Sequence, residues 1–302
     1  MKKIETVRVG TRGSKLALAQ TELVIAAWRE KYPEVAVEPV IIRTKGDKIQ
    51  DRPLLDFGGK GVFVTEFEEA LYDGRIDLAV HSAKDMPMKL GDNLLIAGTL
   101  PRADARDVLV SRKGRNPAEL ENPVIGTGSL RRQFQLKKLY PHARILGIRG
   151  NVTTRLQKLQ DRECDGVVLA MAGLKRLELF NESDYDFRIF SCEEMVPAGG
   201  QGIIAVEGRR GDEISDMVRQ ISDEAAFMEL EAERKALEVL EAGCHAAIGI
   251  IAQVKEREIK LRIRTEWKGQ TLEREETAEC SVRILLAERL ALDIKAMVAA
   301  SD

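Results

Sequence analysis

The chain has 302 residues, of which 44% are hydrophobic, 32% charged and only 5% aromatic, and its formal net charge is −2. This length and composition are ordinary for a globular protein of two or three domains. No apolar run reaches the roughly 18–20 residues that cross a bilayer, and no apolar stretch follows the N-terminal lysines as a secretory signal would require. The four cysteines form neither a CxxC zinc pair nor a dense disulfide framework. We therefore expect a cytoplasmic protein that neither enters a membrane nor binds a metal ion.

The charge is distributed unevenly along the chain. Between Gly126 and Arg176 seven Arg and four Lys stand against three acidic residues, a local balance of +8. From Ser222 to Asp302 the balance is −5. The middle of the chain is therefore expected to meet anions, either a small polyanionic ligand or nucleic acid.

The first hundred residues alternate strand-like and helix-like patterns. The expected strands are Thr6–Thr11, Val35–Thr44, Ile76–His81 and Leu94–Leu100, and the expected helices are Ser14–Tyr32 and Val62–Tyr72. This alternation predicts an α/β layer with a mostly parallel sheet.

Near Pro101 the pattern restarts. The expected strands are Asp107–Ser111, Val124–Thr127, Arg144–Ile148 and Gly166–Ala170, and the expected helices are Ser129–Tyr140, Asn151–Asp161 and Met171–Leu179. A turn-rich stretch, Met195–Gly202, then leads into an apolar strand, Ile203–Glu207. This is a second α/β unit of similar size, although the two show no clear sequence repeat.

The last part of the chain has a different character. Asp212–Leu240 is strongly helical and is long enough for two helices. Three strand-like runs follow, Ile248–Val254, Ile259–Trp267 and Leu272–Cys280, and an amphipathic helix, Arg283–Ala299, ends the series. We expect an α+β module with antiparallel strands.

Three strand ends run into helix starts that suit an anion. In VGTRGS, Ser14 is a plausible N-cap and Arg12 adds a bidentate donor. The same arrangement recurs in IGTGSLRR and in IRGNVTTR. The residues concerned are Thr127, Ser129, Arg131, Arg132, Arg149 and Arg155, and Arg176 follows in AGLKR. Helix N-termini offer unpaired N–H groups and a positive dipole end, and the carboxyl ends of parallel strands share one edge of a sheet. The sequence therefore predicts a pocket for a ligand with several negative charges.

Nucleic acid is the competing partner for these loops, but few aromatic residues lie near them for base stacking and no nucleic-acid module is recognisable. We therefore expect a small polyanion and no nucleic acid. The stretch VHSAKDMP adds a carboxylate, Asp85, beside Ser82 and Lys84. Neighbouring cations would keep Asp85 ionised, so that it could stabilise a developing cation or shuttle protons.

One cysteine, Cys244, lies in the small-residue stretch EAGCHAAIG. The divergence of consecutive side chains disfavours a dyad with the adjacent His245, and metal binding lacks a second local thiolate. Local chemistry alone favours a small buried residue over a functional thiol.

Eight stretches, in this order, resemble the porphobilinogen deaminase family, whose members are also called hydroxymethylbilane synthases. They are GTRGSKLALAQ, GGKGVFVTEFEEAL, DLAVHSAKDMP, GTGSLRRQFQL, IRGNVTTRLQKL, LAMAGLKRL, PAGGQG and ERKALEVLEAGCHAAIG. The resemblance covers nearly the whole chain.

The resemblance implies a fold of two periplasmic-binding-protein-like α/β domains, with the active cleft between them, plus a smaller C-terminal α+β domain. Residues 1–101 and 198–219 would form a discontinuous first domain, residues 102–197 an anion-binding second domain, and residues 220–302 the third. A loop of the third domain would carry a dipyrromethane cofactor in thioether linkage to Cys244, which reverses the interpretation of that residue as a buried one. The family further implies a monomer.

The implied reaction joins four porphobilinogen units head to tail, releases ammonia at each step and gives linear hydroxymethylbilane, a precursor of tetrapyrroles such as haem. Asp85 matches the family's catalytic aspartate, which stabilises an azafulvenium-like cation and assists proton transfer. The arginines named above would bind pyrrole acetates and propionates. Ser14, Ser82, Lys84, Thr127 and Ser129 match cofactor- or substrate-contacting positions, and Lys60 lies on the loop thought to cover the cleft.

Three positions depart from the family pattern. Gly128 stands where a second serine is common, His245 replaces a usual glutamine, and Asp56 takes a position at which some relatives have lysine. Two other classes of protein stay possible from the residues alone: a non-catalytic binding protein on the same scaffold, and a transferase or hydrolase with Cys244 as its nucleophile.

Overall fold

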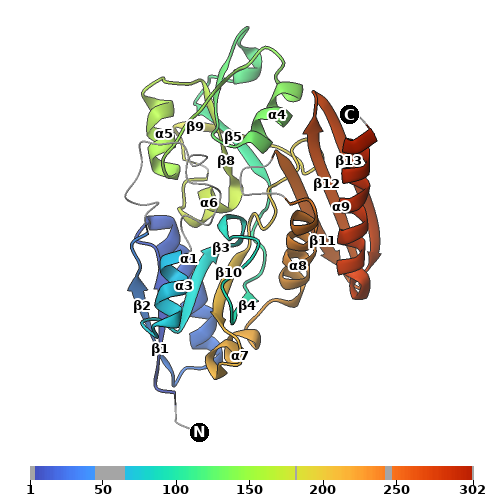
Figure 1. The fold of residues 1–302 in the computed structure, drawn as a ribbon. Helices are drawn as coiled ribbons and strands as arrows, with labels where there is room; N and C mark the ends of the chain where they lie inside the picture. The colour runs from blue at the N-terminus through green and yellow to red at the C-terminus, as the bar shows by residue number, and fades with distance from the viewer. Residues whose placement is uncertain (1–3, 45–64, 181, 242–246, 301–302) are drawn as a thin grey trace. The chain divides into compact units, whose positions relative to one another are not determined.

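The computed structural model describes residues 4–44, 65–180, 182–241 and 247–300 (Figure 1). The chain divides into two compact units. The first comprises Met1–Ala103 and Ile203–Leu230, and the second comprises Asp104–Gly202 and Glu231–Asp302. The division into three domains stays a prediction.

The first unit contains a five-stranded sheet. Its strands are β1 (Thr6–Thr11), β2 (Ala36–Ile41), β3 (Leu78–Ser82), β4 (Leu94–Thr99) and β10 (Ile204–Arg209), in the order β2-β1-β3-β10-β4. β1 pairs in parallel with β2 and β3, whereas β10 is antiparallel to β3 and β4. Four strands thus run in one direction, which confirms the expected mostly parallel sheet, and the chain returns from the second unit to supply the strand that runs against them.

Helices cover both faces of this sheet, as Figure 1 shows. They are α1 (Lys15–Lys31), α3 (Thr65–Tyr72), α7 (Glu213–Arg219), the 3₁₀ turn Ala83–Asp85 and the first turns of α8 (Glu224–Val239). Strand side chains alternate between the two faces. Val80 belongs to the core that contains Trp28 of α1, whereas Ala79 belongs to the core that contains Phe67 of α3.

The second unit has a sheet of the same topology. Its strands are β5 (Asp107–Arg112), β6 (Val124–Gly126), β7 (Arg144–Leu146), β8 (Gly166–Ala170) and β9 (Tyr185–Ile189), in the order β7-β6-β8-β5-β9. Here β5 is the strand antiparallel to both of its neighbours. The helices are α4 (Leu130–Leu139), α5 (Val152–Gln160), α6 (Met171–Arg176) and the 3₁₀ turn Pro117–Glu119. Each sheet therefore has one strand that runs antiparallel to the other four. In the first unit β10 lies between β3 and β4, and in the second unit β5 lies between β8 and β9.

The C-terminal part of this unit is an antiparallel meander of β11 (Ile248–Lys255), β12 (Glu258–Trp267) and β13 (Gln270–Glu279). After the 3₁₀ turn Cys280–Val282, α9 (Arg283–Ala300) packs on one face of the meander (Figure 1). Alternate residues of β12 are buried, as period-two strand geometry requires. Ile259, Leu261 and Ile263 enter a core that also contains Leu286 and Leu290 of α9.

Most expected elements are confirmed, and Asp212–Leu240 is indeed two helices, α7 and α8. The strand expected over Val35–Thr44 is shorter, because its pairing with β1 ends at Ile41. The half-buried strand β9, which pairs with β5 at the edge of the described sheet, was not expected from the sequence. Among the described residues no helix is long and apolar enough to cross a membrane.

Candidate functional site

The first unit contains a pocket at the carboxyl ends of β1 and β3. Its walls come from the start of α1, from the end of β3 and from the turn after it. The lining residues are Arg12, Ser14, Leu16, Ala17, Gln20, Val80, His81, Ser82 and Asp85. Because β1 and β3 are adjacent parallel strands, their ends meet at one edge of the sheet, where ligands of α/β folds bind. The structure thus brings together four residues expected from the sequence: Arg12, Ser14, Ser82 and Asp85.

The start of α1 forms an anion-binding wall of this pocket. Ser14 is the N-cap of the helix, and its Oγ accepts a hydrogen bond of 3.2 Å from the Ala17 N–H. The first turn of α1 contains no acidic residue, so the positive end of the helix dipole is not offset there. Arg12, half-buried just before this turn, adds a permanent cation.

Asp85 presents a carboxylate at the same pocket. It ends the 3₁₀ turn that follows β3, and it is exposed, whereas Lys84 beside it is half-buried. Ser82, at the end of β3, accepts a hydrogen bond of 2.8 Å from the Gln20 side chain of α1. An exposed carboxylate beside a cation and a helix N-terminus can pair with a positive or N–H-bearing part of a ligand whose anionic groups bind the other wall.

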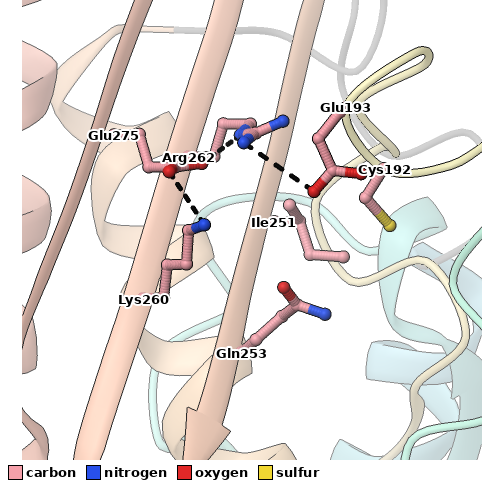
Figure 2. A pocket seen from close by; sticks show the side chains of 7 residues that line it. All are labelled: Cys192, Glu193, Ile251, Gln253, Lys260, Arg262 and Glu275. Atoms are coloured by element: carbon pink, nitrogen blue, oxygen red, sulfur yellow. Dashed lines mark hydrogen bonds and ion pairs between the residues drawn. The ribbon is translucent and has the colours of Figure 1, made fainter.

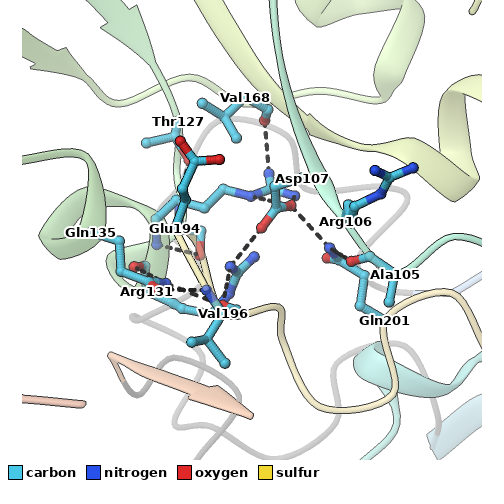
Figure 3. A network of polar contacts seen from close by, with 12 residues as sticks. Ala105, Arg106, Asp107, Thr127, Arg131, Gln135, Val168, Glu194, Val196 and Gln201 are labelled. Atoms are coloured by element: carbon cyan, nitrogen blue, oxygen red, sulfur yellow. Dashed lines mark hydrogen bonds and ion pairs between the residues drawn. The ribbon is translucent and has the colours of Figure 1, made fainter. Parts of the chain in front are cut away.

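In the second unit, Arg131 and Arg132 are buried around one carboxylate, that of Asp107. Figure 3 shows Arg131 and Asp107 within this polar network. Arg131 donates to Asp107 at 2.6 Å, and Arg132 donates to it through Nε at 3.1 Å and through its terminal nitrogen at 2.7 Å. Burial alone would raise the pKa of Asp107, but the two guanidinium groups outweigh it and hold that pKa below its ordinary value. Two cations against one anion leave this buried cluster with an excess of one positive charge.

The surroundings of this cluster use most of its donors. Arg131 also donates to the Val196 carbonyl at 2.8 Å, and Arg132 donates to the Val168 carbonyl at 2.8 Å. The Nε of Arg131 is buried and has no hydrogen-bond partner among the described residues. The pair was expected to line an anion pocket at the start of a helix. It does lie in the first turn of α4, but both side chains are buried, and within the described residues one donor and one charge are unmatched.

The N-terminus of α4 lies next to these arginines. Ser129 is its N-cap and accepts from the Arg132 N–H at 3.4 Å. Thr127 is fully buried and accepts from the Ser129 N–H at 3.2 Å. At Gly128 a Cβ atom would approach the Ile148 carbonyl oxygen to 3.0 Å. This close approach is a steric reason for glycine, rather than the serine common in the family, at position 128.

The remaining expected arginines lie around the N-terminus of α5 and at the end of α6. Asn151 is the N-cap of α5, and Arg155 donates to the Gly150 carbonyl at 2.8 Å. Arg149, just before Gly150, is half-buried. Arg176 donates to the Gly202 carbonyl at 2.7 Å, and burial lowers its pKa to about 10. At neutral pH Arg176 is therefore a charged, partly desolvated cation, and no carboxylate in the described part of the chain forms an ion pair with it within 4.0 Å.

A second, smaller pocket lies between the Cys192–Glu193 segment and the C-terminal sheet (Figure 2). Arg262 forms ion pairs with Glu275 and, at 3.8 Å, with Glu193, and Lys260 pairs with Glu275 at 2.8 Å. Its charges are matched within the protein, so this pocket offers little to an anionic ligand.

Some expected residues lie outside the described part of the chain. These are Cys244, Lys60, His245 and Asp56. Within the described residues, no group of three His, Cys, Asp or Glu side chains could hold a metal ion.

The structure also adds residues that sequence reasoning missed. Asp107 opens β5 directly before the apolar run VLV, and a charge beside such a run was a signal of buried pairing. Gln20 and His81 line the first pocket, although both belong to stretches already singled out.

Fold and site together define an α/β protein whose first unit has anion donors and a carboxylate side by side at strand ends. Comparison with known proteins makes this class specific. The family model described as "Porphobilinogen deaminase, dipyromethane cofactor binding domain" matches residues 7–216, and the model "Porphobilinogen deaminase, C-terminal domain" matches residues 227–300. The chain belongs to the porphobilinogen deaminase family.

Individual relatives agree with this assignment. The porphobilinogen deaminase of Clostridium acetobutylicum is 44% identical over 248 residues, which are 82% of this chain and 84% of that protein. That of Lachnospira eligens is 47% identical over 247 residues, 80% of this chain and 82% of that protein. Among solved structures, a probable amino-acid ABC transporter extracellular-binding protein of Bacillus subtilis matches with a TM-score of 0.43 and 11% identity, over 72% of this chain and 90% of that one. This last likeness is too weak to carry an inference.

Proposed function

We propose that the chain joins four porphobilinogen molecules head to tail, with release of ammonia at each step, to give linear hydroxymethylbilane. The observation that carries this proposal is the match of both family models, which together cover residues 7–216 and 227–300. The pocket of Arg12, Ser14 and Asp85 supports it, because it combines anion donors with a carboxylate.

The residues present fit a dipyrromethane. Each ring of such a group has anionic acetate and propionate arms and a pyrrole N–H. The arms need N–H donors and cations, which the α1 N-terminus and Arg12 can supply in the first unit. In the second unit, Arg176 is a cation of the kind that such an arm needs. The buried cluster around Asp107 has an unmatched positive charge and an unpaired Arg131 Nε–H. The pyrrole N–H groups need an acceptor, which Asp85 supplies. When bound, the group provides the primer to which the first pyrrole is joined.

We assign the chemical role to Asp85. Its exposed carboxylate can accept a hydrogen bond from a pyrrole N–H and stabilise positive charge that develops on the ring when the amine leaves. Arg12 and Ser14 hold the acidic arms of the same ligand, so that the ring is fixed against the carboxylate. The proposed binding residues are those expected from the sequence: Arg12, Ser14, Lys60, Ser82, Lys84, Thr127, Ser129, Arg131, Arg132, Arg149, Arg155 and Arg176.

We further propose that Cys244 attaches the dipyrromethane through a thioether. Support comes from the family match and from the sequence, in which Cys244 falls in the stretch that resembles the family's cysteine loop. On the same resemblance we propose a monomer that works in the cytoplasm without a metal ion.

The test is turnover of porphobilinogen by the purified protein, with ammonia and linear tetrapyrrole both quantified. We expect four ammonia molecules per tetrapyrrole. Asp85→Ala is expected to lower ammonia release about 10²- to 10³-fold, in line with the loss of a preorganised electrostatic group. Binding of porphobilinogen without ammonia release would instead identify a binding protein, and turnover in Asp85→Ala close to that of the wild type would refute the role of Asp85.

A further inference from the structure

A buried polar pair lies directly behind the Asp85 pocket. His81 Nε2 and Glu207 Oε2 are 2.9 Å apart, and the side chains are 8% and 0% exposed. The two residues lie on adjacent antiparallel strands. His81 is opposite Ala205 and Glu207 is opposite Ala79, so the pair is a diagonal contact across β3 and β10.

This pair is an unusual feature for the interior of a sheet. The ring of Phe67 packs against His81 with its edge, at 5.0 Å between centroids, and the neighbouring positions Ala79 and Ala205 are apolar and fully buried. The second oxygen of Glu207, Oε1, is buried and has no hydrogen-bond partner among the described residues. Burial of an incompletely paired carboxylate costs stability. The pair is therefore poorly explained by stability alone.

The backbone is also irregular at this position. The pairing of β10 with β4 shifts register between Val206 and Glu207. The extra residue lies in the partner strand: Val206 is opposite Gly98 and Glu207 is opposite Ile96, so Ala97 of β4 is left unpaired beside Glu207. Here the shift coincides with the residue that faces His81.

The pair connects to the functional pocket through a short segment of chain. His81 lines the pocket, and the next residue, Ser82, is bonded to Gln20 of α1. The Ala83 N–H then donates to the Ile203 carbonyl, immediately before β10, at 3.0 Å. The segment Ile203–Glu207 thus holds the chain on both sides of Ser82, at His81 before it and at Ala83 after it, and Asp85 comes two residues after Ala83.

We propose that the His81–Glu207 pair is the positioning element of the Asp85 pocket, which fixes the end of β3 and so aims the turn that carries Ser82, Lys84 and Asp85. This inference rests on the proposed function, since it assigns Asp85 the chemical role. His81 and Glu207 need not touch the substrate. They act through the geometry of the turn, and a displacement of about 1 Å at such a turn can cost on the order of 10²-fold in rate.

The test compares variants that keep or remove the hydrogen bond. Glu207→Gln keeps the shape and an acceptor for His81, so kcat is expected to stay within about 3-fold of the wild type. Glu207→Leu removes the acceptor, and kcat is expected to fall about 30- to 100-fold while KM for porphobilinogen changes less than about 3-fold. Because Glu207→Leu leaves the imidazole without its acceptor, the double variant H81F/E207L is measured as well, and it is expected to be as slow as E207L.

Stability separates positioning from a structural role. Replacement of a buried ionic pair by apolar side chains is often neutral or stabilising, so H81F/E207L is expected to melt at or above the wild-type temperature and still turn over slowly. The matched control is Glu229→Gln, another buried carboxylate of the same unit, which pairs with Arg102 at 3.2 Å. It is expected to lower the melting temperature without the loss in kcat.

The outcomes also distinguish failure of the positioning role from failure of the proposed deaminase activity. Intact mass confirms that each variant carries the same dipyrromethane as the wild type, so that a loss in kcat is not a loss of cofactor. If the wild type releases no ammonia from porphobilinogen, the proposed function fails. If the wild type is active and E207L or H81F/E207L turns over within about 3-fold of it, the positioning role is refuted.

Discussion

Asp107 is the residue whose replacement should disturb the second unit most. In the Asp107→Asn variant the carboxylate charge disappears, while Arg131 and Arg132 stay buried beside it. At an effective dielectric constant of about 20, two unit charges roughly 4 Å apart interact by about 4 kcal/mol. The variant loses two such attractions, and the repulsion between the guanidinium groups is no longer offset. The hydrogen bonds that asparagine can still accept recover part of this energy.

We therefore expect Asp107→Asn to destabilise the unit by about 3–5 kcal/mol, the range for removing one partner of a buried ion pair. For a unit of this size that corresponds to a fall in melting temperature of roughly 6–20 °C. Native-state hydrogen exchange is the better assay, because the chain contains more than one folding unit. The free energy of opening is read from peptides of β5 (Asp107–Arg112) and α4 (Leu130–Leu139).

The matched control is Asp186→Asn, which removes an exposed carboxylate that pairs with Lys113 at 2.9 Å. We expect this change to cost less than about 1 kcal/mol, as for other exposed ion pairs. A change of less than about 1 kcal/mol in Asp107→Asn itself would show that the arginines have other sources of compensation, and the reasoning about this cluster would be wrong.

Two further predictions concern Arg176 and Cys164. Arg176→Leu is expected to raise KM for porphobilinogen about 10- to 100-fold, since a charged hydrogen bond to an acidic arm is worth about 1.5–3 kcal/mol. Lys175→Leu, which removes the exposed neighbour that pairs with Asp104, is the control, and equal KM values for the two variants would contradict the assignment. Burial raises the pKa of the Cys164 thiol to about 11, so the fold favours the neutral thiol and loses stability as the pH rises from the unfolded value of about 8.5 through 11. Alkylation by iodoacetamide at pH 8, followed by peptide mass spectrometry, should therefore label Cys164 far more slowly than the half-buried Cys280, and equal rates would refute this.

The sequence predicted those features that depend on neighbours along the chain. Ser14, Ser129 and Asn151 are all observed as N-caps, because an N-cap is a local contact between one side chain and the next turn of backbone. The strand ends before these caps were predictable for the same reason. The sequence predicted that anion-binding strand ends share a sheet edge, and the structure adds that β1 and β3 are the adjacent strands that bring Arg12 and Asp85 to one pocket.

Features that depend on strand order could not be predicted in this way. Asp107 meets Arg131 across 24 residues, and His81 meets Glu207 across 126 residues. Both contacts require an antiparallel strand, β5 or β10, to lie inside an otherwise parallel sheet. Hydrophobic periodicity indicates that a segment is a strand, but not which strands it pairs with. The two sheets also share one topology, and the sequence shows no repeat that would reveal it.

The central claim is that the chain is a porphobilinogen deaminase whose dipyrromethane is attached through Cys244. The most direct test is the intact mass of the denatured protein, measured for the wild type and for Cys244→Ser, alongside ammonia release by the same samples. We expect the active wild type to exceed the mass of its 302-residue sequence by one dipyrromethane, and the variant to show neither the added mass nor the activity. An active wild type with the mass of the unmodified chain, or the added mass retained in Cys244→Ser, would contradict the claim.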